Sequence, residues 1–259
     1  MGKGHKDKVA VITGGANGIG QAFAKRLAED GVHVAIADLA DGGATVKLVE
    51  AAGRQALAVV CDVSKEDSVA AMAKQVQAKF GHVDIVVNCA GIFPQQDFST
   101  MTFADWRKVL SINLDGTFLV TAAFVPGMRA RKWGRVITST SSGVVSPIPG
   151  LAISNALRMS LVGWSKTLAR EVGRDGITAN IVLPGRIATP RITFLDEQKA
   201  KREGRSVAEV SSESVVSIPV GRYGDPKEYA AVVTFLASVQ AAYVTGSVVR
   251  IDGGLITSV

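Results

Sequence analysis

The chain is poor in cysteine and lacks long hydrophobic runs, and each shortage excludes a class of protein. Two cysteines among 259 residues cannot build a disulfide framework. Cys61 and Cys89 instead read as small buried residues, so we expect a reducing, cytoplasmic location. No apolar run approaches the roughly 18 residues of a membrane span, so no membrane association is expected. The polar, basic segment 1–8 argues against a signal peptide, and no metal site is expected.

What remains is the composition of a globular protein, with 47% hydrophobic and 20% charged residues. The formal net charge is +6, but the positive residues are scattered along predicted helices. The two short basic clusters, at residues 129–132 and 199–202, contain no interleaved aromatic residues, so nucleic-acid binding is not expected. A solvated helix face explains both clusters. Attraction of an anionic substrate or carrier is the alternative.

Apolar runs of strand length alternate with longer amphipathic stretches. The Val- and Ile-rich runs read as strands covered on both faces and lie at residues 9–12, 32–37, 56–60, 85–87, 135–138, 178–182 and 248–251. The predicted helices lie near residues 18–30, 41–53, 65–80, 103–131, 150–173 and 225–238. This alternation predicts a single α/β domain over residues 1–259, with a doubly wound (Rossmann) fold. We expect a seven-stranded parallel sheet with helices on both faces, and a substrate-loop insertion with short helices at 186–222.

A glycine-rich segment separates the first predicted strand from the first predicted helix. It contains Gly14, Asn17, Gly18, Ile19 and Gly20. Glycines let the backbone turn tightly and approach a pyrophosphate, and the N-terminus of the helix supplies free N–H groups. Its position between a strand and a helix predicts a dinucleotide cradle rather than a merely structural turn.

Asp38 ends the second predicted strand, 18 positions beyond Gly20. A carboxylate at that point accepts hydrogen bonds from the adenosine ribose hydroxyls and repels a 2′-phosphate. The glycine segment contains no Arg or Lys that would attract such a phosphate. The sequence therefore predicts NAD(H) rather than NADP(H), and capping of the following helix is the alternative role for Asp38.

With this glycine segment and Asp38, the chain resembles the classical type of the short-chain dehydrogenase/reductase family. The resemblance covers essentially its full length. It is similar to 3-oxoacyl carrier-protein reductases and secondary-alcohol dehydrogenases. The resemblance implies that the cofactor-binding set extends to Asp62 and Val63 after the third strand, to Asn88, Ala90 and Gly91 after the fourth, and to Pro184, Gly185, Ile187 and Thr189 beside the nicotinamide. It also implies a homotetramer, built in part by the C-terminal strand.

The same resemblance implies a catalytic set with two departures. The family uses Asn113, a Ser that holds the carbonyl, a Tyr that passes the proton and a Lys four residues later, on the same helix face. Counting along this chain assigns the carbonyl-holding role to Ser141, but the Tyr position is Ser154 and the Lys position is Arg158. Lys166 lies two turns beyond Arg158, too far to replace the lysine.

The three tyrosines of the chain do not replace the missing one. Tyr229 and Tyr243 read as structural, and Tyr223 borders the long loop, where folding over the site is its alternative role. Arg158 keeps a positive charge that can hold the nicotinamide ribose, but an aliphatic Ser154 hydroxyl is a far weaker acid than a phenol. The expected loss is about 10²- to 10⁴-fold, the usual contribution of general acid–base catalysis. A water held by Ser154, Ser141 and Asn113, or a substrate with its own acidic group, would compensate.

Three functions follow. The first is an NAD(H)-dependent oxidoreductase that interconverts a carbonyl and an alcohol on a small-molecule substrate, with Ser154 and Arg158 in the usual Tyr and Lys positions. The second is a catalytically impaired, NAD(H)-binding pseudoenzyme or regulator. The third is an enzyme that keeps the cofactor for non-redox chemistry such as elimination or isomerisation. Arg186 and Arg191, nearest the nicotinamide segment, are the loop cations that an anionic substrate would meet.

Overall fold

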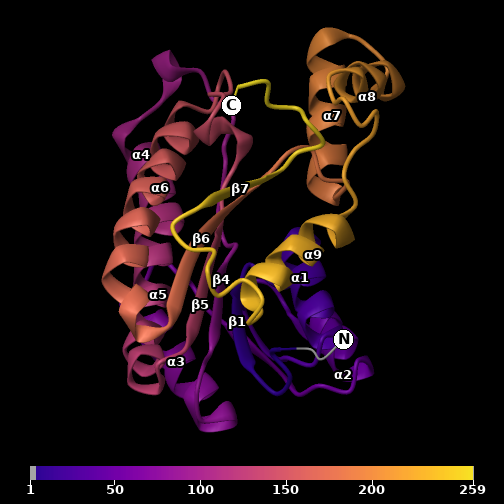
Figure 1. Ribbon diagram of the computed structural model, residues 1–259. Coiled ribbons are helices and arrows are strands. Elements are labelled where there is room, and N and C mark those ends of the chain that lie inside the picture. The colour runs from indigo at the N-terminus through magenta and orange to yellow at the C-terminus, as the bar shows by residue number, and fades with distance from the viewer. Residues whose placement is uncertain (1–3, 259) are drawn as a thin grey trace.

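One seven-stranded parallel sheet runs through the computed structural model, which describes residues 4–258 (Figure 1). The strand order β3-β2-β1-β4-β5-β6-β7 shows that the chain starts at the middle and winds outward in both directions. The strands are β1 (Val9–Thr13), β2 (His33–Asp38), β3 (Ala56–Val60), β4 (Ile85–Asn88), β5 (Gly134–Ser139), β6 (Ile177–Pro184) and β7 (Val248–Ile251). Every pairing between neighbouring strands is parallel, so the predicted fold class is confirmed. Residues 1–3 of the basic N-terminal segment lie outside the described residues.

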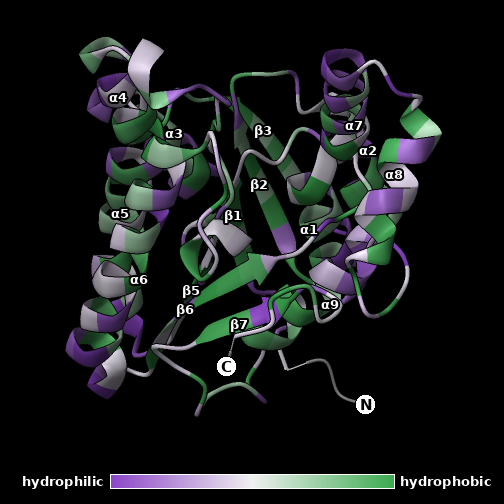
Figure 2. Ribbon diagram, turned by 90° about the horizontal axis from the view of Figure 1, so that it is seen from above, coloured by the Kyte–Doolittle hydropathy of each residue, from purple (hydrophilic) through white to green (hydrophobic). Residues whose placement is uncertain are grey.

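Helices cover both faces of the sheet and make three layers. In Figure 1, α3, α5 and α6 lie on one side of the strands and α1, α2 and α9 on the other. The helices are α1 (Gly18–Glu29), α2 (Gly43–Ala51), α3 (Glu66–Phe80), α4 (Phe103–Leu110), α5 (Gly116–Arg131), α6 (Ala152–Val172), α7 (Pro190–Glu203), α8 (Val207–Val216) and α9 (Pro226–Ala237). The strands are predominantly hydrophobic and the polar residues gather on the outer faces of the helices, as Figure 2 shows. This is the pattern of a sheet buried between helical layers.

Shorter helical turns lie at η1 (Phe98–Thr100), η2 (Ser111–Asp115), η3 (Ser142–Val144) and η4 (Gly173–Asp175). The η2 turn is π-helical and joins α4 to α5, so that 103–131 is one continuous helical segment. The sequence predicted that segment as a single helix but not the π-helical turn inside it. Turns of this kind occur often at functional sites.

Local signals fix several helix starts. Thr102 and Asp105 form a reciprocal capping box at α4, and Asp225 and Glu228 form one at α9, where Pro226 occupies the first turn. Gly81 ends α3 in a left-handed conformation, with φ of 77°. These caps satisfy backbone groups that the helix ends would otherwise leave without partners.

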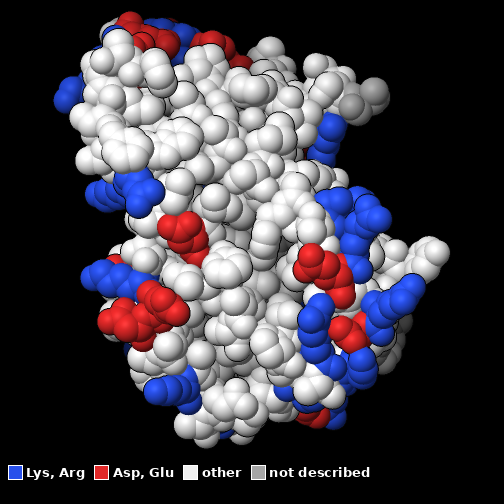
Figure 3. Space-filling model, turned by 90° about the vertical axis from the view of Figure 1, so that its left-hand side faces the viewer, with Lys and Arg blue, Asp and Glu red and all other residues white. Residues whose placement is uncertain are grey.

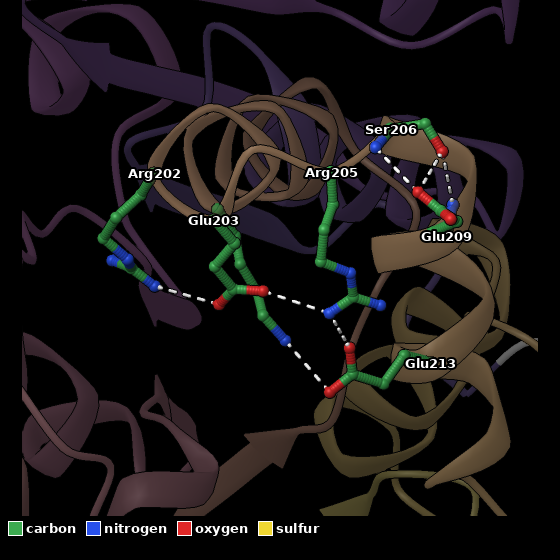
Figure 4. Close-up of polar contacts among 7 residues, drawn as sticks. Arg202, Glu203, Arg205, Ser206, Glu209 and Glu213 are labelled. Carbon is green, nitrogen blue, oxygen red and sulfur yellow. Dashed lines mark hydrogen bonds and ion pairs between the residues drawn. The ribbon is translucent and has the colours of Figure 1, made fainter.

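The segment predicted as a substrate loop folds into α7 and α8. Ion pairs join the two helices: Glu213 of α8 binds Arg205 and Lys199, and Arg205 also contacts Glu203 (Figure 4). The basic cluster at 199–202 therefore takes part in this network. The cluster at 129–132 is likewise paired, since Asp175 binds both Arg129 and Lys132. The bonds make α7 and α8 one hairpin above the body of the fold.

One helical segment of the described chain, Phe103–Arg131, is long and apolar enough to cross a membrane by length and composition, with a mean hydropathy of 1.5. No such segment is expected from the sequence, in which no apolar run approaches the length of a membrane span. In the structure its α5 part packs Val120, Phe124 and Met128 into the core beneath the sheet. A core helix passes the same length test, so the finding is weak evidence for a membrane span.

Candidate active site

The glycine segment is closed toward the protein and open toward solvent. Gly14 has φ of +68°, and a Cβ on Gly14 would lie 2.9 Å from the Ala90 backbone. A Cβ on Gly20 would lie only 2.1 Å from the Gly14 carbonyl oxygen. Gly18, with φ of +56°, has nothing within 4 Å of its Cβ position. The packing side of the loop thus requires glycine, and the other side leaves room for a ligand.

Helix α1 begins at Gly18 and presents free backbone donors beside that space. Asn17 is the N-cap residue, but its side chain makes no capping hydrogen bond. The first intrahelical bond is donated by the Gln21 N–H to the Asn17 carbonyl, which leaves the N–H groups of Gly18, Ile19 and Gly20 unpaired within the helix. The first turn contains no acidic residue. Free donors and the positive end of the helix fit a bound pyrophosphate.

The Asp38 carboxylate lies against the glycine segment. One oxygen accepts from the Ala16 N–H at 3.0 Å and the other from the Ala40 N–H at 3.0 Å. These bonds fix the carboxylate at the carboxyl end of β2 and leave lone pairs for further donors. The helix-cap alternative is not seen, because the N-cap of α2 is Gly42 and no side chain caps that helix.

Two residues that the sequence analysis missed hold the glycine segment in place. The fully buried Thr45 hydroxyl lies 2.9 Å from the Gly15 carbonyl, to which it donates. The Gln21 amide donates to Thr45 at 3.0 Å and to the Ala16 carbonyl at 3.2 Å. Both sit on helices as ordinary polar residues, and no sequence signal marks them.

The third and fourth strands bring their predicted residues to the same sheet edge. Asp62 accepts from the Ser64 N–H and hydroxyl, and the hydroxyl bond is the main reason why the pKa of Asp62 lies below its usual value. Val63 is buried and packs against Gly116. Thr13 at the end of β1 accepts the N–H groups of Cys89 and Ala90 at 3.1 and 3.2 Å, which ties the glycine segment to the end of β4.

Asn88 lies inside the protein rather than at the open edge. Its amide donates to Thr121 at 3.0 Å and Thr138 at 3.3 Å, linking β4 to α5 and β5. Its buried oxygen has no hydrogen-bond partner among the described residues. Neither cysteine forms a disulfide; Cys61 is buried as expected, and Cys89 is half-buried beside Arg158, where burial raises its pKa to about 12.

The catalytic candidates come together around the ends of β4 and β5. The Asn113 amide binds the backbone of Ile92, accepting from the N–H and donating one of its two hydrogens to the carbonyl, both at 2.9 Å. The Ser141 Oγ accepts from the Gly143 N–H at 3.2 Å, so its own hydrogen is free to donate. Ser154 is 4% exposed, and its side-chain hydroxyl makes no hydrogen bond with the residues that the structure describes.

Arg158 projects from α6 into the same region. Its Nη1 donates to the Ser139 carbonyl at 3.1 Å, its guanidinium carbon lies 4.5 Å from the centre of the Phe93 ring, and its buried Nε has no partner among the described residues. Gly91 packs beside it, since a Cβ there would lie 3.1 Å from Nη2. Burial lowers the pKa of Arg158 to about 10, so the guanidinium stays charged at neutral pH.

The structure gives no substitute for the missing tyrosine and lysine. Tyr223 donates to the buried Asp196 at 2.6 Å, and the buried Tyr229 hydroxyl lies 2.9 Å from the Ser139 Oγ. Tyr243 is fully exposed and does not pack in the core, contrary to the expected structural role. Lys166 donates to the Gly246 carbonyl, away from Arg158, in agreement with the prediction.

The segment after β6 completes the edge. Pro184 ends β6, and Gly185 approaches Asp252 so closely that a Cβ would lie 2.6 Å from the Asp252 Cα. Ile187 is buried and Thr189 is the N-cap residue of α7. Across residues 4–258, no group of three or more His, Cys, Asp or Glu residues could hold a metal ion.

A parallel sheet with a glycine-rich turn at its centre and polar residues at the carboxyl edge is typical of dinucleotide-binding α/β proteins. Comparison with known proteins narrows this class. The family model described as enoyl-(acyl carrier protein) reductase matches residues 14–256. The chain belongs to the short-chain dehydrogenase/reductase family, as the sequence resemblance predicted.

The relatives are reductases and dehydrogenases. The chain is 37% identical to the short-chain reductase protein NovJ of Streptomyces niveus, over 96% of this chain and 94% of that protein. It is also 37% identical to the (3R)-3-hydroxyacyl-CoA dehydrogenase of Rattus norvegicus, over 96% of each chain. The structure of L-sorbose reductase from Gluconobacter frateurii, complexed with NADPH and L-sorbose, matches with a TM-score of 0.95 and 32% identity over 100% of both chains. Carbonyl/alcohol oxidoreduction is therefore the chemistry of the proteins that this chain resembles.

Proposed function

We propose that the chain is an NAD(H)-dependent oxidoreductase that interconverts a carbonyl and an alcohol, with Ser154 and Arg158 in place of the family's Tyr and Lys. The observation that best supports this proposal is the open space at Gly18. The free N–H groups of α1 lie beside that space, and the Asp38 carboxylate is fixed next to it. Two further carboxyl-edge groups, at Asp62–Val63 and Ala90–Gly91, are assigned to the nucleotide. Pro184, Gly185, Ile187 and Thr189 are assigned to the nicotinamide end, and Asn88 supports the edge from inside.

The carboxylate of Asp38 favours NAD(H). Its two backbone bonds hold it at the end of β2, and the residues that follow add a second carboxylate, Asp41, and no cation up to the start of α2. A 2′-phosphate placed there would meet negative charge. The L-sorbose reductase structure contains NADPH, so the cofactor choice of this chain needs its own test.

Asp38→Asn is expected to narrow the preference for NADH over NADPH by about tenfold, because it removes the repelling charge from a partly buried position. Calorimetric titration of both cofactors into wild type and variant measures the ratio. Glu50→Gln removes the same charge from the exposed surface of α2 and should leave the ratio unchanged. An unchanged ratio in the Asp38 variant would show that the carboxylate does not select the cofactor.

Ser141, Ser154, Arg158 and Asn113 have separate roles in the proposed reaction. When bound, the nicotinamide supplies or accepts a hydride at the carbonyl carbon. Ser141, whose oxygen accepts the Gly143 N–H, donates its hydrogen to the carbonyl oxygen. The positive charge of Arg158 would stabilise the negative charge that develops on the carbonyl oxygen. The guanidinium N–H groups would donate to the nicotinamide ribose. Asn113 holds the Ile92 backbone through one N–H and one oxygen lone pair, and its second N–H would help Ser141 and Ser154 to hold a proton-carrying water.

The second candidate is a catalytically impaired, NAD(H)-binding pseudoenzyme or regulator. It is favoured by the buried Ser154, because its hydroxyl is a poor acid and has no hydrogen-bond partner among the described residues. The discriminating experiment sets calorimetric NADH binding beside the absorbance of the reduced cofactor during incubation with ketones and alcohols. Consumption of NADH supports the oxidoreductase, and binding without turnover of any substrate supports the pseudoenzyme.

We further propose a single-domain, cytoplasmic homotetramer, with residues 186–222 over the substrate. Two unpaired cysteines support the location. The face that carries α4, α5 and α6 is largely uncharged at its centre, as Figure 3 shows, and exposes Phe103, Phe118 and Met159. Such a face suits contact with another copy.

Light scattering on the purified protein is expected to give four times the chain mass of 27.1 kDa. Phe118→Glu, on the exposed face of α5, should lower that mass because it places a charge in the contact. A monomeric wild type would contradict the assembly without touching the proposed chemistry.

A further inference from the structure

Arg158 is a buried cation without an anionic partner. It is 5% exposed, and no Asp or Glu carboxylate of residues 4–258 lies within ion-pair distance of its guanidinium. Its one hydrogen bond to protein, from Nη1 to the Ser139 carbonyl, leaves most of its five N–H groups unused. A buried charge without compensation is costly, so this arrangement calls for an anion from outside the chain.

A second guanidinium faces the same aromatic ring. Arg191 of α7 lies 5.2 Å from the centre of the Phe93 ring and donates to the Phe93 carbonyl at 3.0 Å. Because Arg158 lies 4.5 Å from that ring centre, the two guanidinium carbons are within about 10 Å of each other. No carboxylate among the described residues pairs with Arg191 either. Two cations thus share one small region beside the proposed nicotinamide position.

A cavity of about 360 Å³ opens beside Phe93 and Arg191, and Arg158 lies behind the Phe93 part of its wall rather than in its lining. Ile92, Pro94 and Val109 give it an apolar wall, and Lys108 and Arg191 supply two cations. Its one carboxylate, Asp105, is occupied by the Thr102 capping box and the Gln96 amide. The volume lies in the range of small-molecule sites, and the charge balance of the lining is positive.

We propose that the substrate is a carbonyl or alcohol compound that carries a carboxylate, and that this carboxylate binds Arg191 in the cavity beside Phe93, with Arg158 adding positive charge from the other contact to that ring. The proposal rests on the oxidoreductase function above and names its substrate class. In the reducing direction, the hydride of NADH forms a C–H bond at the carbonyl carbon, the C=O π bond becomes an O–H bond with a proton from water, and the carboxylate is unchanged. The substrate then supplies the counter-charge that Arg191 lacks among the described residues.

The test uses 3-oxobutanoate, 4-oxopentanoate and 5-oxohexanoate, each paired with its uncharged amide. Calorimetric titration into the protein with NAD⁺ present should show at least one acid bound about tenfold to a hundredfold more tightly than its amide. Arg191→Gln should remove most of that difference and leave amide binding unchanged. Lys201→Gln, the same charge change on an exposed position of α7 outside the cavity, should have no effect.

Failure of this inference is separable from failure of the proposed function. If none of the acids binds more tightly than its amide, or if the two variants behave alike, the substrate class is wrong. NADH oxidation with neutral ketones and no preference for acids would also overturn it, while leaving the oxidoreductase function intact. Selective acid binding that depends on Arg191, without NADH oxidation, would support the anion site and count against the oxidoreductase function.

Discussion

The double variant Ser154→Tyr/Arg158→Lys is expected to reduce ketones with NADH about 10²- to 10⁴-fold faster than the wild-type chain, the usual contribution of general acid–base catalysis. The wild-type Ser154 is a weak acid, and Arg158 does not release a proton at a working pH. A phenol at position 154, one helical turn from a lysine at 158, restores a donor whose pKa the neighbouring cation lowers toward neutrality. The measurement is the initial rate of NADH oxidation under saturating cofactor.

The matched control is Ser154→Phe/Arg158→Lys, which adds the same ring without its hydroxyl. It should stay at or below the wild-type rate, because it fills the space without supplying a proton. A double variant that binds NADH normally yet gains no activity over this control would show that the chain turns over, if at all, by a route that does not use position 154. Equal gains in both variants would assign the effect to packing.

Gly20→Ala is expected to weaken NADH binding by about a hundredfold or to prevent the cradle from forming at all. The added Cβ would lie 2.1 Å from the Gly14 carbonyl oxygen, a backbone atom that cannot turn aside as a side chain would. The glycine loop would have to open, and the free N–H groups of α1 would no longer point toward the pyrophosphate. Calorimetry with NADH measures the loss, and circular dichroism separates it from global unfolding.

The control for this glycine is Gly163→Ala in α6, where a Cβ would have nothing within 4 Å. Alanine favours the helix there, so binding should be unchanged and stability slightly increased, by about 0.5–1 kcal/mol. Wild-type NADH affinity in the Gly20 variant would contradict the assignment of this loop to the nucleotide.

The fold could be predicted because the strands carry their own signal. Two of the seven predicted runs, at 56–60 and 248–251, match β3 and β7 to the residue, and the others differ only at their ends. The carboxyl ends of β1, β4 and β5 lie one residue further on because Thr13, Asn88 and Ser139 are polar residues that still pair with neighbouring strands. An apolar pattern cannot include them, although their backbones pair with neighbouring strands.

The site could be predicted only as a set of positions. The sequence alone indicates the spacing of Gly14, Gly18 and Gly20 and the acidic residue Asp38. Their roles in ligand binding stay predictions. Contacts between distant residues were not legible. No feature of the neighbouring sequence indicates that the Asn113 amide binds the Ile92 backbone. Equally, none indicates that Thr45 in α2 supports the glycine segment. The absence of an acid near Arg158 depends on every element packed around it.

The buried guanidinium of Arg158, which has no acidic partner among the described residues, also bears on how this protein would change under selection. Folding must desolvate Arg158 without the help of an opposite charge, so the residue is a burden on the folded state unless a ligand is present. Laboratory evolution for heat resistance alone would therefore favour replacing it by an apolar side chain of similar length, at the expense of the chemistry. We therefore expect that a bound ligand offsets the cost of burying the Arg158 charge, and that this is why the chain keeps the residue.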